Sequence, residues 1–241
     1  MRGRIVACVS EHERFLRAFH AAHPGITARA MERGGSYDRL AACATGSVLD
    51  LACGDGPLLR RIPHAIGIDV SRAELGRAPR VVQGRAQQLP FADAAFETVL
   101  CHLAFMLFDD VPAVVRELHR VLVPGGRFVA LLGGGPTATG DDAFHRFLAA
   151  LRPHIATPRR FGDPRAKSEA GWRALFAGWS EPRFERWELD LGGTFDEVWT
   201  FLGASYELPE GTPIRDELRA HYGDDHVPCR VVTWCASVTR R

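Results

Sequence analysis

Apolar residues recur along the middle of this chain in short runs that alternate with segments of helical periodicity. The runs lie at residues 48–51, 65–70, 80–83, 96–101 and 127–132, and the helical segments between them include residues 57–62, 72–77 and 111–121. Apolar runs of about 4–8 residues bounded by turn residues are typical of buried strands. Strands that alternate with helices predict a parallel sheet covered by helices on both faces.

The two flanks follow other patterns. Residues 11–44 have helical spacing with a break at 23–25, and residues 141–179 are rich in helical patterns. Residues 183–191 and 230–239 alternate as strands do, with a helix expected at 195–206 between them. We therefore predict one α/β domain with a doubly wound, mostly parallel seven-stranded sheet. Its parts are a helical cap at 1–46, a ligand-binding core at 47–135, a lid insertion at 136–182 and closing strands at 183–241.

Composition narrows the classes of partner. The chain has 241 residues, of which 46% are hydrophobic, and 30 basic against 29 acidic side chains give a net charge of +1. Such a balance provides no overall field to pull the chain onto a nucleic-acid backbone or an anionic membrane, so we expect neither as a partner. The six cysteines form no C-x-x-C pair, which favours a reducing cytoplasm and no metal site. The apolar run at residues 5–9 is too short for a signal-peptide core, and the oligomeric state, monomer or homodimer, stays open.

The sharpest signal is a strand that runs into a glycine-bearing turn. Residues 48–56 end in Ala52, Cys53, Gly54, Asp55 and Gly56, and the next strand ends at Asp69. Glycine lets the backbone pass close beneath a ligand, although a bare Gly-x-Gly also fits an ordinary strand-to-helix turn. A doubly wound sheet places a carboxylate such as Asp69 beside that turn, where it can accept the two hydroxyls of a ribose.

Four blocks in this order resemble the class I S-adenosylmethionine-dependent methyltransferases, and in particular the ubiquinone and menaquinone C-methyltransferases. The blocks are residues 48–56, 67–71, 84–91 and 118–126. The resemblance implies a Rossmann-like methyltransferase fold and S-adenosyl-L-methionine as cofactor. It also implies methyl transfer to an oxygen, nitrogen or carbon atom of a small molecule, of the kind made in natural-product biosynthesis.

The resemblance also implies residue roles. It puts the glycines of the turn beneath the methionine part of the cofactor, Asp69 on the ribose and Val70 beside the adenine. Members usually carry an Asp before Ala86 that accepts the adenine amino group, whereas this chain has Arg85, which offers no acceptor. The side-chain carbonyl of Gln87 is a candidate substitute. In full, the implied cofactor contacts are Tyr37, Asp50, Ala52, Gly54, Gly56, Asp69, Val70, Ala86, Gln87 and Cys101.

His102 follows the fourth strand, where methyl donor and acceptor must meet, and it is the candidate general base because an unperturbed imidazole has a pKa of about 6.5. A structural histidine bonded to its surroundings is the other interpretation. Two alternative functions remain open. The lost acid at Arg85 is compatible with a protein that binds S-adenosylmethionine without catalysis. An NAD(P)-dependent oxidoreductase is a weaker fit, because the third glycine of G-x-G-x-x-G is missing.

Overall fold

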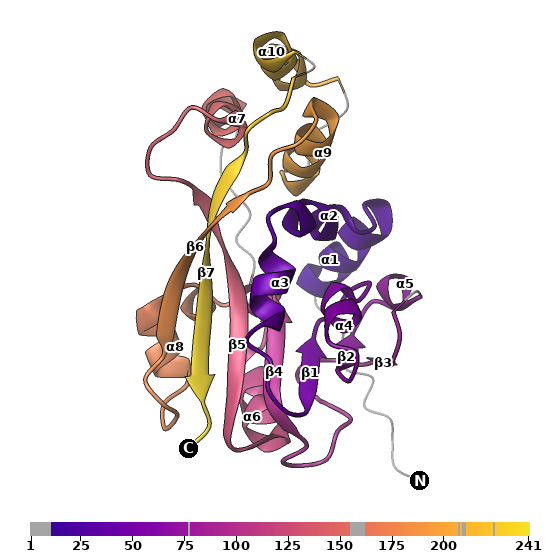
Figure 1. The fold of residues 1–241 in the computed structure, drawn as a ribbon, viewed down its shortest axis with the longest axis vertical. Coiled ribbons are helices and arrows are strands. Elements are labelled where there is room, and N and C mark those ends of the chain that lie inside the picture. Colours follow the sequence, from indigo (N-terminus) through magenta and orange to yellow (C-terminus); the bar gives the residue numbers. More distant parts are fainter. Residues whose placement is uncertain (1–10, 77, 155–161, 207, 209–210, 224) are drawn as a thin grey trace.

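A seven-stranded sheet forms the centre of the molecule (Figure 1). The computed structural model describes residues 11–76, 78–154, 162–206, 208, 211–223 and 225–241. The strand order is β3-β2-β1-β4-β5-β7-β6, in which β1 to β5 pair in parallel and β7 runs antiparallel to both β5 and β6. The predicted doubly wound, mostly parallel sheet is confirmed. The strands are β1 (Val48–Leu51), β2 (Ile66–Asp69), β3 (Val81–Gln83), β4 (Phe96–His102), β5 (Leu122–Pro136), β6 (Arg183–Asp190) and β7 (Arg230–Thr239).

Helices cover both faces of this sheet because its buried strands carry apolar side chains on alternate sides. Leu49 and Leu51 pack on the face that holds α6 and α8, whereas Val48 packs on the face that holds α3 and α4. In the described part of the chain, no helix is long and apolar enough to cross a membrane. The helices are α1 (Glu11–Ala22), α2 (Ile26–Arg33), α3 (Ser36–Ala41), α4 (Pro57–Arg61), α5 (Arg72–Leu75), α6 (Val111–Val121), α7 (Ala143–Leu151), α8 (Glu169–Leu175), α9 (Phe195–Ser205) and α10 (Pro213–Tyr222), with short 3-10 helices at Phe105–Leu107, Arg152–His154 and Pro164–Lys167.

β5 is longer than its apolar run predicted. The glycines at 125 and 126, which look like an entry turn in the sequence, lie inside the strand, and so do the glycines at 133–135. Pairing on both sides holds them there: Leu122 opposes Phe96 of β4, and Pro136 opposes Val231 of β7. The ladder has irregularities at Phe96/Thr98 and Leu132/Gly135, where bulges accommodate the extra backbone.

The predicted lid at 136–182 divides into two parts with different surroundings. α7 packs with α9 and α10 beyond the end of the sheet that holds the site (Figure 1). In α8, by contrast, Trp172 is fully buried and stacks on Phe128 of β5 with ring centroids 5.8 Å apart and an interplanar angle of 8°. Residues 155–161, between these parts, lie outside the described residues. The lid stays a prediction for α7, whereas α8 packs in the core.

Candidate functional site

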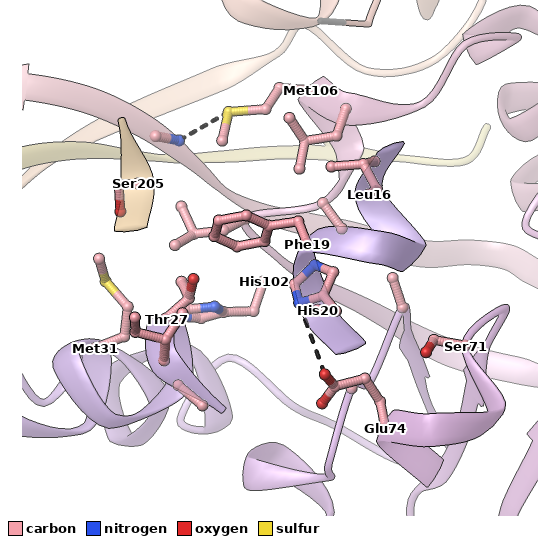
Figure 2. Close-up of a pocket in the computed structure, with 18 of the residues that line it drawn as sticks. Leu16, Phe19, His20, Thr27, Met31, Ser71, Glu74, His102, Met106 and Ser205 are labelled. Carbon is pink, nitrogen blue, oxygen red and sulfur yellow. Dashed lines mark hydrogen bonds and ion pairs between the residues drawn. The ribbon is translucent and has the colours of Figure 1, made fainter. Parts of the chain in front are cut away.

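A cavity of about 1310 Å³ opens at the carboxyl ends of β1, β2, β3, β4 and β5. Helix α1 crosses it, and its Leu16, Phe19 and His20 face the interior (Figure 2). Ligands of doubly wound sheets bind at this edge, in pockets of about 300–1,000 Å³. The larger volume here provides room for two molecules, a nucleoside cofactor and a second ligand.

The turn after β1 and the end of β2 are tied together at the floor of the cavity. Gly54 donates its backbone N–H to Asp69 Oδ2 at 2.9 Å, and Ser71 donates its N–H to Asp69 Oδ1 at 2.7 Å. A carboxylate accepts about four hydrogen bonds, so Asp69 can also accept the two hydroxyls of a ribose. Ala52 and Gly54 line the cavity with left-handed backbones, at φ 61° and 53°. The expected neighbourhood of turn and acid is present.

Two expected cofactor contacts lie elsewhere. Gly56 is absent from the cavity lining; it begins α4 at φ 81°, and a Cβ there would lie 2.9 Å from the Cβ of Ala78. Position 56 requires glycine because its backbone is left-handed and because a side chain there would collide with Ala78. Cys101 is fully buried and absent from the cavity lining, and it packs among the side chains around Phe105 and Val114. Strand alternation explains this correction, since successive side chains point to opposite faces.

Asp50 lies beneath the turn as a buried acid. It is 2% exposed and lines the cavity, and its Oδ2 has no hydrogen-bond partner in the described structure. Burial, and secondarily the negative charge of Asp69, raises the pKa of Asp50 to about 8. Buried polar atoms without partners are rare in proteins, and such an acid facing a cavity is suited to a cationic group of a ligand.

His102 lies at the centre of the cavity in a small network. Its ring stacks on Tyr37 with centroids 4.0 Å apart, and its Nε2 lies 2.9 Å from Ser36 Oγ. Ser36 donates its hydroxyl proton to the carbonyl of Met31 at 3.1 Å, so Nε2 must be the donor toward Ser36. Burial lowers the pKa of His102 to about 3. A neutral imidazole with so low a pKa is a weak base, and the geometry therefore argues against His102 as general base.

The turn after β3 borders the cavity, and the expected cofactor contacts Val70, Ala86 and Gln87 are among its lining residues. Gln87 Nε2 donates to Asp109 Oδ1 at 3.0 Å. Arg85 pairs with Glu13 of α1, with 2.7 Å between Nη1 and Oε2. Sequence reasoning missed Glu13, because no local pattern connects a residue of α1 with a turn that follows β3.

A second contact joins α1 to the floor of the cavity. His20 Nδ1 lies 3.7 Å from Glu74 Oε1 of α5 (Figure 2). Burial lowers the pKa of His20 and raises that of Glu74, so the two groups share a partly desolvated position. Both residues lie outside the motif blocks, and Glu74 was not a sequence candidate.

Beyond His102 the cavity is mostly apolar. Met106 receives a hydrogen bond on its Sδ from the Gly133 N–H at 3.1 Å (Figure 2).

Across the described residues, no group of three His, Cys, Asp or Glu side chains could hold a metal ion. Other aromatic residues of the region, such as Phe105 and Phe147, are fully buried core. The apolar lining includes Phe15, Leu16, Phe19, Met31, Leu103, Met106, Phe108, Phe144, Leu148, Leu151, Leu202 and Val231.

Comparison with known proteins finds relatives that are named as methyltransferases. The chain is 29% identical over 176 residues to an uncharacterised methyltransferase, YcgJ of Bacillus subtilis, which covers 61% of this chain and 65% of the relative. It is 40% identical over 100 residues to the ubiquinone/menaquinone biosynthesis C-methyltransferase UbiE of Desulfotalea psychrophila, covering 36% of this chain and 41% of that protein. It is also 32% identical over 152 residues to the malonyl-[acyl-carrier protein] O-methyltransferase of Halorhodospira halophila, covering 56% and 48%. The chain thus spans less than two thirds of the length of these relatives.

Solved structures share the fold. The crystal structure of YcgJ from Bacillus subtilis aligns with a TM-score of 0.57 at 23% identity, over 86% of this chain and 98% of that one. The PH0226 protein of Pyrococcus horikoshii aligns with a TM-score of 0.52 at 17% identity, over 93% and 99%. The model of a methyltransferase domain family matches residues 49–130, which contain the β1 turn, Asp50 and Asp69. Residues 49–130 of this chain are therefore similar to the methyltransferase domain family.

Proposed function

We propose that the protein transfers a methyl group from S-adenosylmethionine to an oxygen, nitrogen or carbon atom of a small molecule. The observation that carries this proposal is the pairing of Asp69 with Gly54 on the floor of a cavity of about 1310 Å³. A strand-end acid beside a left-handed turn suits a ribose, and the volume suits a cofactor together with an acceptor. The family match over the same residues supports it.

The residues that line the cavity would have two roles, which are binding of the cofactor and alignment of the acceptor. Asp69 would hold the ribose hydroxyls, and the unpartnered Oδ2 of Asp50 would receive the cationic amino group of the methionine part. S-adenosylmethionine supplies a methyl group on a sulfonium, which is already electrophilic. The stacked Tyr37 and His102 and the apolar lining would then orient the acceptor and exclude water. Alignment and desolvation are the main requirements of such a transfer.

Removing the ribose acid tests the proposal. Asp69→Ala should weaken S-adenosylmethionine binding by about 2–4 kcal/mol, because two hydrogen bonds to a charged acceptor are lost. Calorimetric titrations with S-adenosylmethionine, S-adenosylhomocysteine and NADH measure this. Asp93→Ala is the matched control, since Asp93 is exposed, accepts a hydrogen bond from Arg120 and does not line the cavity. If Asp69→Ala stays folded and binds as the wild type does, or if NADH binds better than S-adenosylmethionine, the proposal is wrong.

Catalysis is separated from mere binding by turnover. The names of the relatives supply a first acceptor panel, with hydroquinones of the menaquinone type and malonyl thioesters. Methylated product, with equimolar S-adenosylhomocysteine, supports an enzyme. Tight cofactor binding without product on a panel widened to phenols, amines and polyketide-like rings would favour the non-catalytic alternative.

We place this activity in the cytoplasm. Five cysteines of the described chain have free thiols, and a reducing compartment keeps thiols in that state. Comparing the affinity for S-adenosylmethionine before and after mild oxidation would test the assignment, which predicts that the reduced form is the active one.

A further inference from the structure

Helix α1 brings a carboxylate to the end of the cavity where the base of a bound nucleoside would lie. Glu13 lines the cavity and its side chain is 12% exposed. Its Oε2 lies 2.7 Å from Arg85 Nη1, and its Oε1 lies 2.6 Å from Arg17 Nη2. Two arginines thus fix the position of one poorly solvated carboxylate above the turn that follows β3.

The position of the base follows from the ribose. Asp69 ends β2, and β3 is the next strand of the sheet, so a nucleoside anchored at Asp69 extends its base toward the end of β3. Val70 and Ala86 line that region with apolar groups suited to the faces of a ring. Its edge must then meet the polar groups at the rim, which are Glu13, Arg85 and the pair of Gln87 with Asp109.

We propose that the Glu13–Arg85 ion pair recognises the adenine base of the cofactor, an inference that rests on the proposed function. Adenine presents an amino donor next to a ring-nitrogen acceptor along its edge. A carboxylate beside a guanidinium presents the complementary pair: the Glu13 carboxylate accepts from the amino group, and the Arg85 guanidinium donates to the ring nitrogen. α1 thereby supplies the acceptor that the turn after β3 lacks.

The other acid at this rim fits the role less well. Asp109 is exposed, and its Oδ1 already accepts from Gln87 Nε2 and from the Asp110 N–H, both at 3.0 Å. Water competes strongly for an exposed carboxylate, whereas a desolvated one discriminates between a donor and an acceptor on the ligand. Glu13 is the better-shielded of the two.

Binding of base analogues tests this assignment. We compare S-adenosylhomocysteine with S-inosylhomocysteine, in which a carbonyl oxygen replaces the amino group. The wild type should prefer the adenosyl compound by about 10–100-fold, because the carboxylate repels that oxygen. Glu13→Gln should reduce the preference to less than about threefold, since an amide both donates and accepts.

Matched variants keep the test specific. Glu32→Gln removes another carboxylate paired with an arginine, Arg61, outside this cavity, and should leave the preference unchanged. Glu13→Asp keeps the charge and should retain part of the preference. Arg85→Met should also lower it, because Arg85 positions Glu13 and contacts the base. Circular dichroism and thermal unfolding establish that each variant is folded.

The outcomes separate this inference from the proposed function. If S-adenosylhomocysteine binds and folded Glu13→Gln keeps the full preference for the adenosyl compound, the inference is overturned and the function stands. A shift of the preference in Asp109→Asn but not in Glu13→Gln overturns it as well. If the wild type binds neither compound, the proposed function fails together with it.

Discussion

Asp50→Asn is the most informative single substitution, because it removes a charge that the fold keeps in an unfavourable position. Asp50 is fully buried, its Oδ2 has no partner among the described residues, and Asp69 adds negative charge nearby. In the unfolded chain the carboxyl group has its ordinary pKa of 3.8, whereas burial raises the pKa in the native state to about 8. Asparagine has nearly the same shape and no such ionisation.

The sign and size of the effect follow from proton linkage. Between pH 4 and 8 the native protein holds a proton that the unfolded chain has lost, so the free energy of unfolding falls as the pH rises. Each pKa unit corresponds to 1.36 kcal/mol, and the gap at pH 7 is about three units, which gives about 4 kcal/mol as an upper value. Below pH 4 both states are protonated and the penalty disappears.

Urea unfolding of the cofactor-free protein at pH 5, 7 and 8 measures this difference. Asp50→Asn should gain about 2–4 kcal/mol over the wild type between pH 5 and 8. Asp55→Asn is the control from the same turn; its side chain is 36% exposed and pairs loosely with Arg60 at 3.7 Å, so its effect should stay within about 0.5 kcal/mol. The reasoning is refuted if the free energies of unfolding of wild type and Asp50→Asn, plotted against pH, run parallel from pH 5 to 8.

The same substitution should weaken cofactor binding while it stabilises the empty protein. A cationic amino group beside Asp50 favours its ionised form, so binding at pH 7 should release a proton from the wild type. Calorimetry in buffers of different ionisation enthalpy detects that proton. No proton release from the wild type would place the ligand's amino group elsewhere.

Two further predictions concern the network around His102 and the packing of α8. His102→Ala should lower kcat by less than about tenfold and leave the pH profile without an acid limb near 6.5, because burial holds the pKa of His102 near 3 and Nε2 faces Ser36. If the wild type loses activity below about pH 6.5 and the variant does not, His102 is the general base and this reasoning is wrong. Trp172→Ala should cost about 3–5 kcal/mol of stability in urea unfolding, since Trp172 is fully buried against Phe128. If the substitution lowers the free energy of unfolding by less than about 1 kcal/mol, α8 is part of the predicted lid and not of the core.

Local sequence determined the elements whose pattern is self-contained. The structure places β1 at Val48–Leu51 and α6 at Val111–Val121, as the apolar run and the helical period predicted. α6 also has its start signal, since Asp110 accepts from the Ala113 N–H at 3.1 Å. These elements need only their own residues to be recognised.

The errors arose where contacts distant in sequence decide the outcome. The glycines in β5 belong to a strand because β4 and β7 pair with it. α10 was not predicted, as only Ile214 and Leu218 are buried on it. Trp172 looked like a lid residue because an aromatic side chain alone does not indicate which surface it covers. Hydrophobic periodicity reports burial but not the partner.

In the candidate site, too, the residues of a local motif could be predicted, whereas those joined by contacts distant in sequence could not. Asp69 and Gly54 follow from a motif within one supersecondary unit, and their contact is local to β1 and β2. The motif lacks an acceptor at Arg85, and on its own this departure was compatible with a binder without catalysis. The structure relates that loss to α1, whose Glu13 meets Arg85 while its His20 reaches Glu74 of α5. If the nucleoside binds as we propose, a helix held near both ends by these contacts would couple cofactor binding to its own docking. We therefore expect the turn after β3 and α1 to vary together, since an acid in the turn would make Glu13 unnecessary and would leave Arg85 without its partner.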